Sequence, residues 1–155
     1  MNKTDWPDEL NLFEYFRGET MAYGLFEDRF GNIRRLFTVA IKGTVSGDQL
    51  TLEEDFFYED GELENRTWVI ERGQNAVYSG TAGDVLGRAE GQQSKARFTW
   101  RYDMLLNISG RHHKVKFDDW MFLMPNNVLL NRAVVKKFGI KLGTVFISFS
   151  KDTKI

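Results

Sequence analysis

The chain has 155 residues, the usual size of a single domain and long enough to bury a core without disulfides or metals. It carries 21 basic and 22 acidic residues with no block of like charge, which argues against nucleic-acid binding, and it lacks cysteine, which excludes disulfides, thiolate metal sites and cysteine nucleophiles. No apolar run approaches the roughly 20 residues needed to cross a bilayer, so no transmembrane segment is expected.

The first 17 residues are predicted to form a short helical segment. Pro7 suits a first helical turn, Leu10, Phe13 and Phe16 form an apolar stripe, and Gly18 would end the helix. We expect this helix to close one end of the domain.

Residues 18–150 are predicted to be all-β. Turn signals recur at 30–32, 46–48, 59–61, 72–75, 109–111, 125–127 and 138–140, and the segments between them alternate in polarity. The expected strands cover 18–27, 33–43, 48–58, 62–71, 76–82, 84–91, 95–106, 113–123, 127–137 and 141–150. An open meander of about ten antiparallel strands leaves two exposed edges, so we expect it to close into a barrel. Residues 1–155 are then one domain.

The clearest amphipathic strand is ARFTWRYDM. Alternation places one set of its residues on a single face, which we expect to point inward: Ala96, Phe98, Trp100, Tyr102 and Met104.

A carboxylate and a guanidinium are predicted to meet inside the barrel. Glu54 shares an inward row with Phe56, and Arg66 shares one with Trp68. If the loop between the two strands is a three-residue type with Gly61 in the left-handed conformation, Glu54 lies directly opposite Arg66. An unpaired charge there would cost several kcal/mol, so we expect the two side chains to pair. The pair is either purely structural or also orients the polar group of a ligand.

The stretch KFDDWMFLM carries two adjacent acids. Neighbours in a strand face opposite ways, so Asp118 and Asp119 do not form an acid and base pair on one substrate. The phase of the surrounding apolar residues places Asp119 inward, where we expect it to satisfy a backbone group or a charge.

Signals for catalysis, metal binding or a cofactor are weak. His112 and His113 are adjacent beside a turn and have no third ligand at a suitable spacing. The chain has no GxSxG motif, and its segment TAGDVLGRAEG lacks the spacing of a phosphate-binding loop. We therefore predict no catalytic residue, no metal and no cofactor, and an enzyme is not favoured.

Several segments together resemble one protein family: GLFEDRFG (24–31), LTLEEDFFYEDGE (50–62), RTWVI (66–70), AGDVLGRAEG (82–91), TWRYDM (99–104), DDWMFLM (118–124) and NRAVVKKFG (131–139). The family consists of small bacterial envelope proteins without an established activity, many of them predicted lipoproteins. The resemblance implies a lipocalin-like or fatty-acid-binding-protein-like (calycin) barrel, an envelope or periplasmic location, and genes beside those of fatty-acid modification. Family members commonly carry a lipidated cysteine before the domain, which this chain lacks.

We therefore expect a binding module that holds a lipid or another small amphiphile in the barrel. The predicted ligand-binding residues are Glu54, Phe56, Arg66, Trp68, Trp100, Tyr102 and Asp119. One alternative is an envelope accessory or interaction protein whose packed barrel is only a scaffold. A less favoured alternative is an isomerase or cyclase acting on a lipid-like substrate, with Glu54, Asp119 or Tyr102 as acid or base.

Overall fold

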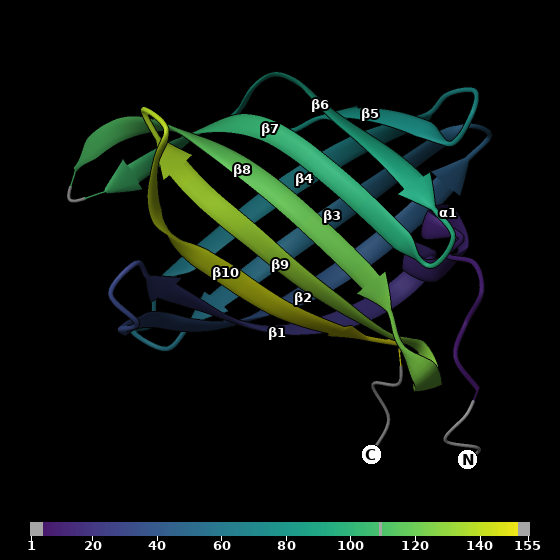
Figure 1. Ribbon diagram of the computed structural model, residues 1–155, viewed down its shortest axis with the longest axis horizontal. Helices are drawn as coiled ribbons and strands as arrows, with labels where there is room; N and C mark the ends of the chain where they lie inside the picture. Colours follow the sequence, from purple (N-terminus) through teal and green to yellow (C-terminus); the bar gives the residue numbers. More distant parts are fainter. Residues whose placement is uncertain (1–4, 109, 152–155) are drawn as a thin grey trace.

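The computed structural model describes residues 5–108 and 110–151, which form one closed antiparallel β-barrel (Figure 1). Its strands are β1 (Gly18–Asp28), β2 (Ile33–Ser46), β3 (Gln49–Tyr58), β4 (Leu63–Arg72), β5 (Val77–Thr81), β6 (Val85–Ser94), β7 (Arg97–Ile108), β8 (Arg111–Leu123), β9 (Val128–Lys137) and β10 (Ile140–Ser150). A short 3-10 turn, η1 (Pro125–Asn127), joins β8 to β9, and the one α-helix is α1 (Leu12–Phe16).

Each strand pairs with the next one, and pairing between β1 and β10 closes the barrel. That last pair runs from Met21 opposite Ser150 to Asp28 opposite Gly143, so the sheet closes on itself, with a short ladder between β4 and β5 (residues 69–72 with 78–81). The predicted up-and-down meander is confirmed, and the predicted strand ends lie within about three residues of the observed ones.

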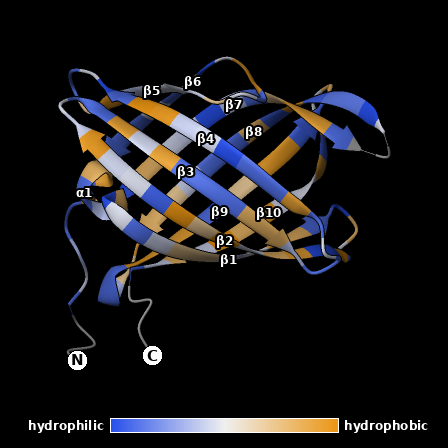
Figure 2. Cartoon of the chain, turned by 180° about the vertical axis from the view of Figure 1, so that it is seen from behind, coloured by the Kyte–Doolittle hydropathy of each residue, from blue (hydrophilic) through white to orange (hydrophobic). Residues whose placement is uncertain are grey.

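Hydropathy alternates along many of the strands (Figure 2), and the alternation separates a buried interior from a solvated outer wall. In β7, Phe98, Trp100 and Met104 are buried, whereas Arg97 and Arg101 between and beside them are exposed. The inward face predicted for this strand is therefore confirmed.

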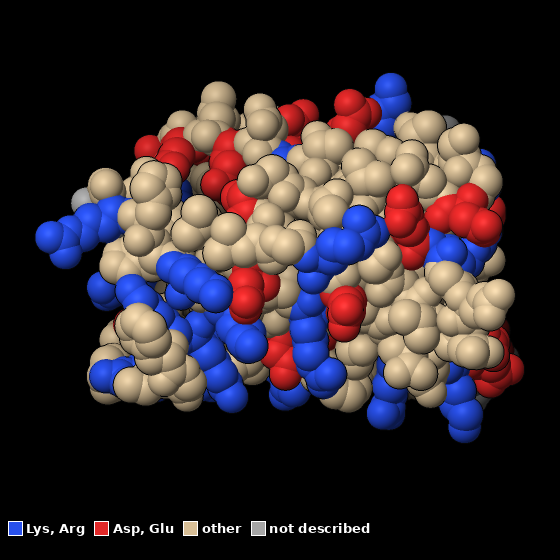
Figure 3. Space-filling view, turned by 90° about the horizontal axis from the view of Figure 1, so that it is seen from above, with Lys and Arg blue, Asp and Glu red and all other residues tan. Residues whose placement is uncertain are grey.

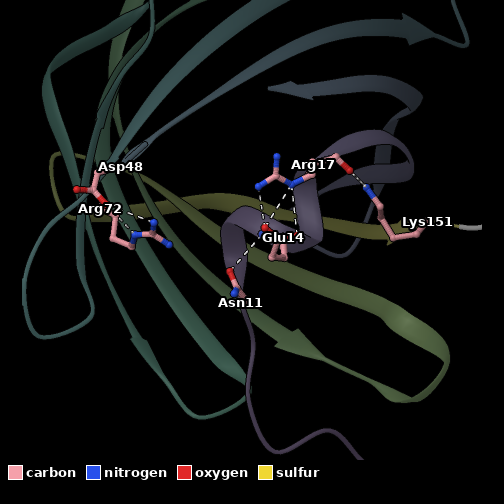
Figure 4. Close-up of polar contacts among 6 residues, drawn as sticks. All are labelled: Asn11, Glu14, Arg17, Asp48, Arg72 and Lys151. Atoms are coloured by element: carbon pink, nitrogen blue, oxygen red, sulfur yellow. Dashed lines mark hydrogen bonds and ion pairs between the residues drawn. The ribbon is translucent and has the colours of Figure 1, made fainter. Parts of the chain in front are cut away.

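Helix α1 closes one end of the barrel and is shorter than the predicted segment 1–17. The Asn11 side-chain oxygen accepts a hydrogen bond from the backbone N–H of Glu14, which places the helix start after Asn11 (Figure 4). Pro7 therefore precedes the helix, and residues 1–4 lie outside the described part of the chain. At the other end of the helix, Lys151 Nζ donates to the carbonyl oxygen of Arg17 at 3.1 Å.

The two ends of the barrel differ in packing. Side chains near α1 are buried against one another: Phe13, Phe16, Leu50, Ile70, Tyr78, Phe98, Leu129 and Phe149. At the opposite, open end, which carries the β1–β2, β3–β4, β5–β6 and β9–β10 connections, inward side chains such as Phe26, Phe37 and Phe117 are only partly buried. The half of the barrel away from α1 is therefore the less tightly packed one. Among the described residues, no helix is long and apolar enough to span a membrane.

Gly43 is the position where α1 approaches the barrel wall most closely. A Cβ atom added there would lie 1.7 Å from the carbonyl oxygen of Phe16. We expect Gly43→Ala to push the helix away and to lower the free energy of unfolding by about 2–3 kcal/mol. Urea denaturation measures the loss. The control is Thr44→Ala, on the solvated face of the same strand, and equal stabilities of the two variants would contradict the plug packing.

Candidate functional site

Glu54 and Arg66 lie opposite each other in the β3–β4 pair, as predicted. The connecting loop has Gly61 at φ 90°, and the Tyr58 N–H donates to the Glu62 carbonyl at 3.0 Å, which is the expected three-residue hairpin. The predicted contact between the two side chains, however, is wrong. The partner of Arg66 is Asp84, from the β5–β6 loop: Arg66 Nε lies 3.1 and 3.0 Å from its two carboxylate oxygens and Nη2 lies 2.9 Å from Oδ2.

This bidentate pair explains why Arg66 does not pair with Glu54. The flat guanidinium matches a carboxylate that faces it edge-on, and Asp84 has that placement. Among the described residues, no hydrogen bond or ion pair holds the Glu54 carboxyl, which interacts with the Arg66 charge at longer range.

Further polar groups extend the Arg66–Asp84 pair toward the open end. Arg66 Nη2 lies 3.6 Å from Glu64 Oε1, and the Tyr58 hydroxyl donates to the same oxygen at 2.9 Å. Side-chain exposure falls from 38% at Glu64 and 33% at Asp84 to 12% at Arg66. The guanidinium also lies over the Phe56 ring, 5.0 Å from its centre. The cluster therefore leads from solvent at the open end into the barrel.

Asp119 lies deeper and points inward, as predicted. The Tyr102 hydroxyl donates to Asp119 Oδ2 at 3.4 Å, and the Tyr102 ring stacks on Phe117 with centres 5.1 Å apart. Asp119 Oδ1 is buried and has no hydrogen-bond partner among the described residues. We expected the Asp119 carboxyl to be hydrogen-bonded, and only one of its two oxygens has a partner among the described residues. A buried acceptor or donor without a partner costs about 1–3 kcal/mol.

Burial controls the protonation of these carboxyl groups. It raises the pKa of Asp119 to about 8, with the Tyr102 hydrogen bond acting in the opposite direction. It raises the pKa of Glu54 to about 7, although the charge of Arg66 favours ionisation. Burial opposes the charge of Arg66 as well, but the contacts with Asp84 and the charge of Glu54 outweigh it and raise the Arg66 pKa. At neutral pH the buried site thus holds a charged guanidinium, a protonated Asp119 and a Glu54 near its midpoint.

The charges of the cluster disfavour the binding of an anion. The single guanidinium is already bound to the carboxylate of Asp84 and lies near that of Glu64. A further carboxylate would meet acidic groups rather than a free cation. The site therefore favours an uncharged polar group.

The aromatic residues predicted for the site lie at two depths. Trp68 and Trp100 are buried, with ring centres 5.6 Å apart, and Trp68 also lies edge-on to Tyr102 at 5.1 Å. They form the floor of the open half rather than its wall. The wall consists of inward, partly buried apolar side chains: Phe26, Phe37, Leu106, Phe117 and Val145.

The sequence matches, over residues 2–151, the family described as "protein of unknown function (DUF3833)". The chain belongs to this family. A comparison with curated proteins finds no match. Among solved structures, the barrel is similar to that of the S-type phycobiliprotein lyase CPES from Guillardia theta, with a TM-score of 0.68, 9% sequence identity, and coverage of 93% of this chain and 92% of the lyase. At this identity the similarity shows the fold alone, and it confirms the lipocalin-like barrel expected from the sequence.

Three site residues of this DUF3833 chain were missing from the predicted set. Glu64 was recognisable, because it precedes Arg66 by two residues and so shares its face. Tyr58 shares a face with Glu54 and Phe56 by the same argument. Asp84 could not be assigned from sequence, because it lies in the β5–β6 loop, beyond the paired residues of β4 and β5, and its contact with Arg66 depends on the conformation of that loop.

A depression of about 720 Å³ lies over β1–β4, and Glu54 and Arg66 are among the residues that line it. Its lining includes consecutive residues such as Ala40, Ile41 and Lys42, so it follows the backbone of the wall from outside. Exposed Glu53, Asp55, Asn65 and Thr67 border it. In the described part of the chain, no group of three or more His, Cys, Asp or Glu side chains is placed to hold a metal ion.

Proposed function

We propose that the protein binds a small amphiphile in the open half of the barrel, with an uncharged polar group of the ligand at Asp119. The observation that carries this proposal is the buried Oδ1 of Asp119, which has no hydrogen-bond partner in the described part of the chain, whereas Oδ2 accepts from the Tyr102 hydroxyl. A ligand oxygen placed there would complete the hydrogen bonding of the carboxyl. The apolar part of the ligand then extends toward the open end along Phe117, Phe37 and Phe26.

The protonation of Asp119 determines which polar groups suit the site. Because its pKa is about 8, the carboxyl is protonated at neutral pH and can donate a hydrogen bond to an oxygen acceptor. A long-chain alcohol, ester or amide offers such an oxygen without adding charge. A fatty-acid carboxylate at Asp119 would add a negative charge near Glu54 and Asp118. Arg66, the cation that acts on Asp119, is already paired with Asp84, so the carboxylate is the poorer ligand.

The packing of the barrel supports a binding module over a scaffold. Aromatic rings pack together in both halves, but those of the open half, such as Phe37 and Phe117, are only partly buried, and polar side chains lead from solvent into that half. A barrel that served only as a scaffold would gain stability by replacing those polar groups with apolar ones. We therefore interpret the cluster as functional.

Displacement of a bound fluorescent dye such as Nile red tests this proposal. We expect dodecanol to displace the dye at concentrations about tenfold lower than dodecanoate, because the carboxylate meets acidic groups. Asp119→Leu is expected to weaken dodecanol binding about tenfold through the loss of one buried hydrogen bond.

The neighbouring acid provides the matched control. Asp118 faces outward and pairs with Arg101 at 3.1 Å, so Asp118→Asn should leave the binding of dodecanol unchanged. If Asp119→Leu binds dodecanol as tightly as the unmodified protein, the polar end of the ligand does not lie at Asp119. Equal affinity for dodecanol and dodecanoate would overturn the preference for an uncharged group.

A further inference from the structure

Two loops at the open end carry exposed apolar side chains. The bases of the β1–β2 and β9–β10 loops adjoin where β1 pairs with β10, and the Arg29 N–H donates to the Leu142 carbonyl at 3.0 Å, whereas the tip of the β9–β10 turn extends away from the β1–β2 loop along the same end of the barrel (Figure 1). Their apolar side chains project into solvent: Phe30 (75% exposed), Ile33 (52%), Phe138 (92%) and Ile140 (56%). We name these four residues the rim corner. Several large apolar side chains exposed at one end of a molecule favour a contact surface there.

The conformation of Phe138 shows that the fold alone does not favour an aromatic there. Phe138 and Gly139 are the two central residues of a hairpin turn, with φ of 52° and 77°. Such turns favour Asn-Gly, because a bulky residue in the left-handed region is strained. The ring is almost fully exposed, so burial in the core does not offset that strain.

Unpaired positive charge lies next to the rim corner. Lys136 and Lys141 are directly opposite each other in the β9–β10 pair, an arrangement that destabilises a sheet. Among the described residues, neither lysine has an ion pair with an acidic side chain. Arg29 lies over the Phe30 ring at 4.7 Å and is exposed. Figure 3 shows Lys and Arg side chains gathered over the lower left of the surface, toward the open end.

Nearby acidic groups do not neutralise this charge. The Asp28 carboxylate accepts hydrogen bonds from the backbone N–H groups of Phe30 and Asn32 and lies 3.6 Å from Arg34 Nε. It thereby holds the β1–β2 loop in shape. The acidic loop residues Asp60 and Glu62 belong to the β3–β4 connection, where they pair with Arg35.

We propose that the rim corner inserts into the interface of an anionic phospholipid bilayer and so brings the open end of the barrel against the membrane. Exposed aromatic and aliphatic tips beside lysine and arginine bind such interfaces through apolar burial together with attraction to anionic lipid. The opposed lysines would then have phosphate partners. This inference deepens the proposed function, because it gives an amphiphile a path between membrane and barrel, but docking itself is measurable without any ligand.

Co-sedimentation with lipid vesicles tests the docking surface. The two vesicle preparations are phosphatidylcholine alone and an equal mixture of phosphatidylcholine and phosphatidylglycerol. We expect sedimentation with the mixed vesicles at low salt. Phe138→Asn should lower the partition coefficient about tenfold, because it removes an inserted ring. The same substitution should raise Tm by about 2 °C, because Asn tolerates the left-handed turn.

Charge reversal separates the electrostatic contribution from insertion. Lys141→Glu is expected to lower partitioning into the mixed vesicles roughly tenfold. The matched control is Lys95→Glu, an exposed lysine in the hairpin turn at the end closed by α1, which should sediment like the unmodified protein.

Each outcome decides the proposal. The rim corner does not dock on anionic lipid if Phe138→Asn and Lys141→Glu sediment as strongly as the unmodified protein. The same conclusion follows if the unmodified protein sediments with neither preparation, and a protein is then the remaining kind of partner for the rim corner. If vesicle binding fails while dodecanol still displaces the dye, docking is wrong and the proposed function stands. If vesicle binding holds while dodecanol binding fails, docking stands and the ligand proposal is wrong.

Discussion

Arg66→Ala is expected to lower the free energy of unfolding by about 3–5 kcal/mol, because it leaves the partly buried Asp84 carboxylate without its partner. It also removes the positive charge near Glu64 and Glu54. Guanidinium chloride denaturation at neutral pH measures the loss.

Two further variants test whether the lost stability comes from the pair of Arg66 with Asp84. Arg101→Ala removes an exposed arginine that pairs with Asp118 on the outer wall, and it should cost less than about 1 kcal/mol. Adding Asp84→Asn to Arg66→Ala should restore part of the lost stability, because the uncompensated charge is removed. An Arg66→Ala protein as stable as Arg101→Ala would show that the guanidinium does not hold the cluster together.

The stability of the protein is expected to fall as pH rises from about 5 to about 8, by roughly 3 kcal/mol from Glu54 alone. The pKa of Glu54 is about 7 in the folded chain against a usual value of 4.5, so the folded state binds more protons than the unfolded state in this range. Stability is therefore greatest at the acidic end and is lost as the buried carboxyl ionises. Asp119, with a pKa of about 8, acts in the same direction.

Glu54→Gln should flatten this pH dependence, because the glutamine cannot ionise. Urea denaturation at a series of pH values compares it with the unmodified protein and with Glu53→Gln, which changes the exposed neighbour on the outer wall. A Glu54→Gln protein whose stability falls with pH as steeply as that of the unmodified protein would show that Glu54 is not a buried, protonated group.

Most of the fold could be predicted from local signals. Turn residues repeat at hairpin spacing, and Gly61 sets both the type of the β3–β4 loop and the register that places Glu54 opposite Arg66. Alternation within a strand also placed Asp119 inward, because one face of an antiparallel strand is buried. The start of α1 was missed because the Asn11 cap outweighs the helical signal of Pro7.

The candidate site was only partly predictable. Register gives the neighbour of a residue across a strand pair, but Arg66 contacts Asp84 in the β5–β6 loop, beyond Val69 and Thr81, where the pairing of β4 with β5 has ended. Alternation likewise placed Trp68 and Trp100 inward without showing that they fill the barrel rather than line an open space. The envelope location and lipid anchoring implied by the family resemblance stay predictions.

A crystal structure of the protein with a bound bromododecanol tests the binding proposal most directly. We expect the alcohol oxygen within hydrogen-bond distance of Asp119 Oδ1 and the bromine signal toward the open end, near Phe26 and Phe37. An alcohol bound only in the outer depression over β1–β4, or an interior that stays empty at saturating alcohol, would contradict a ligand site inside the barrel.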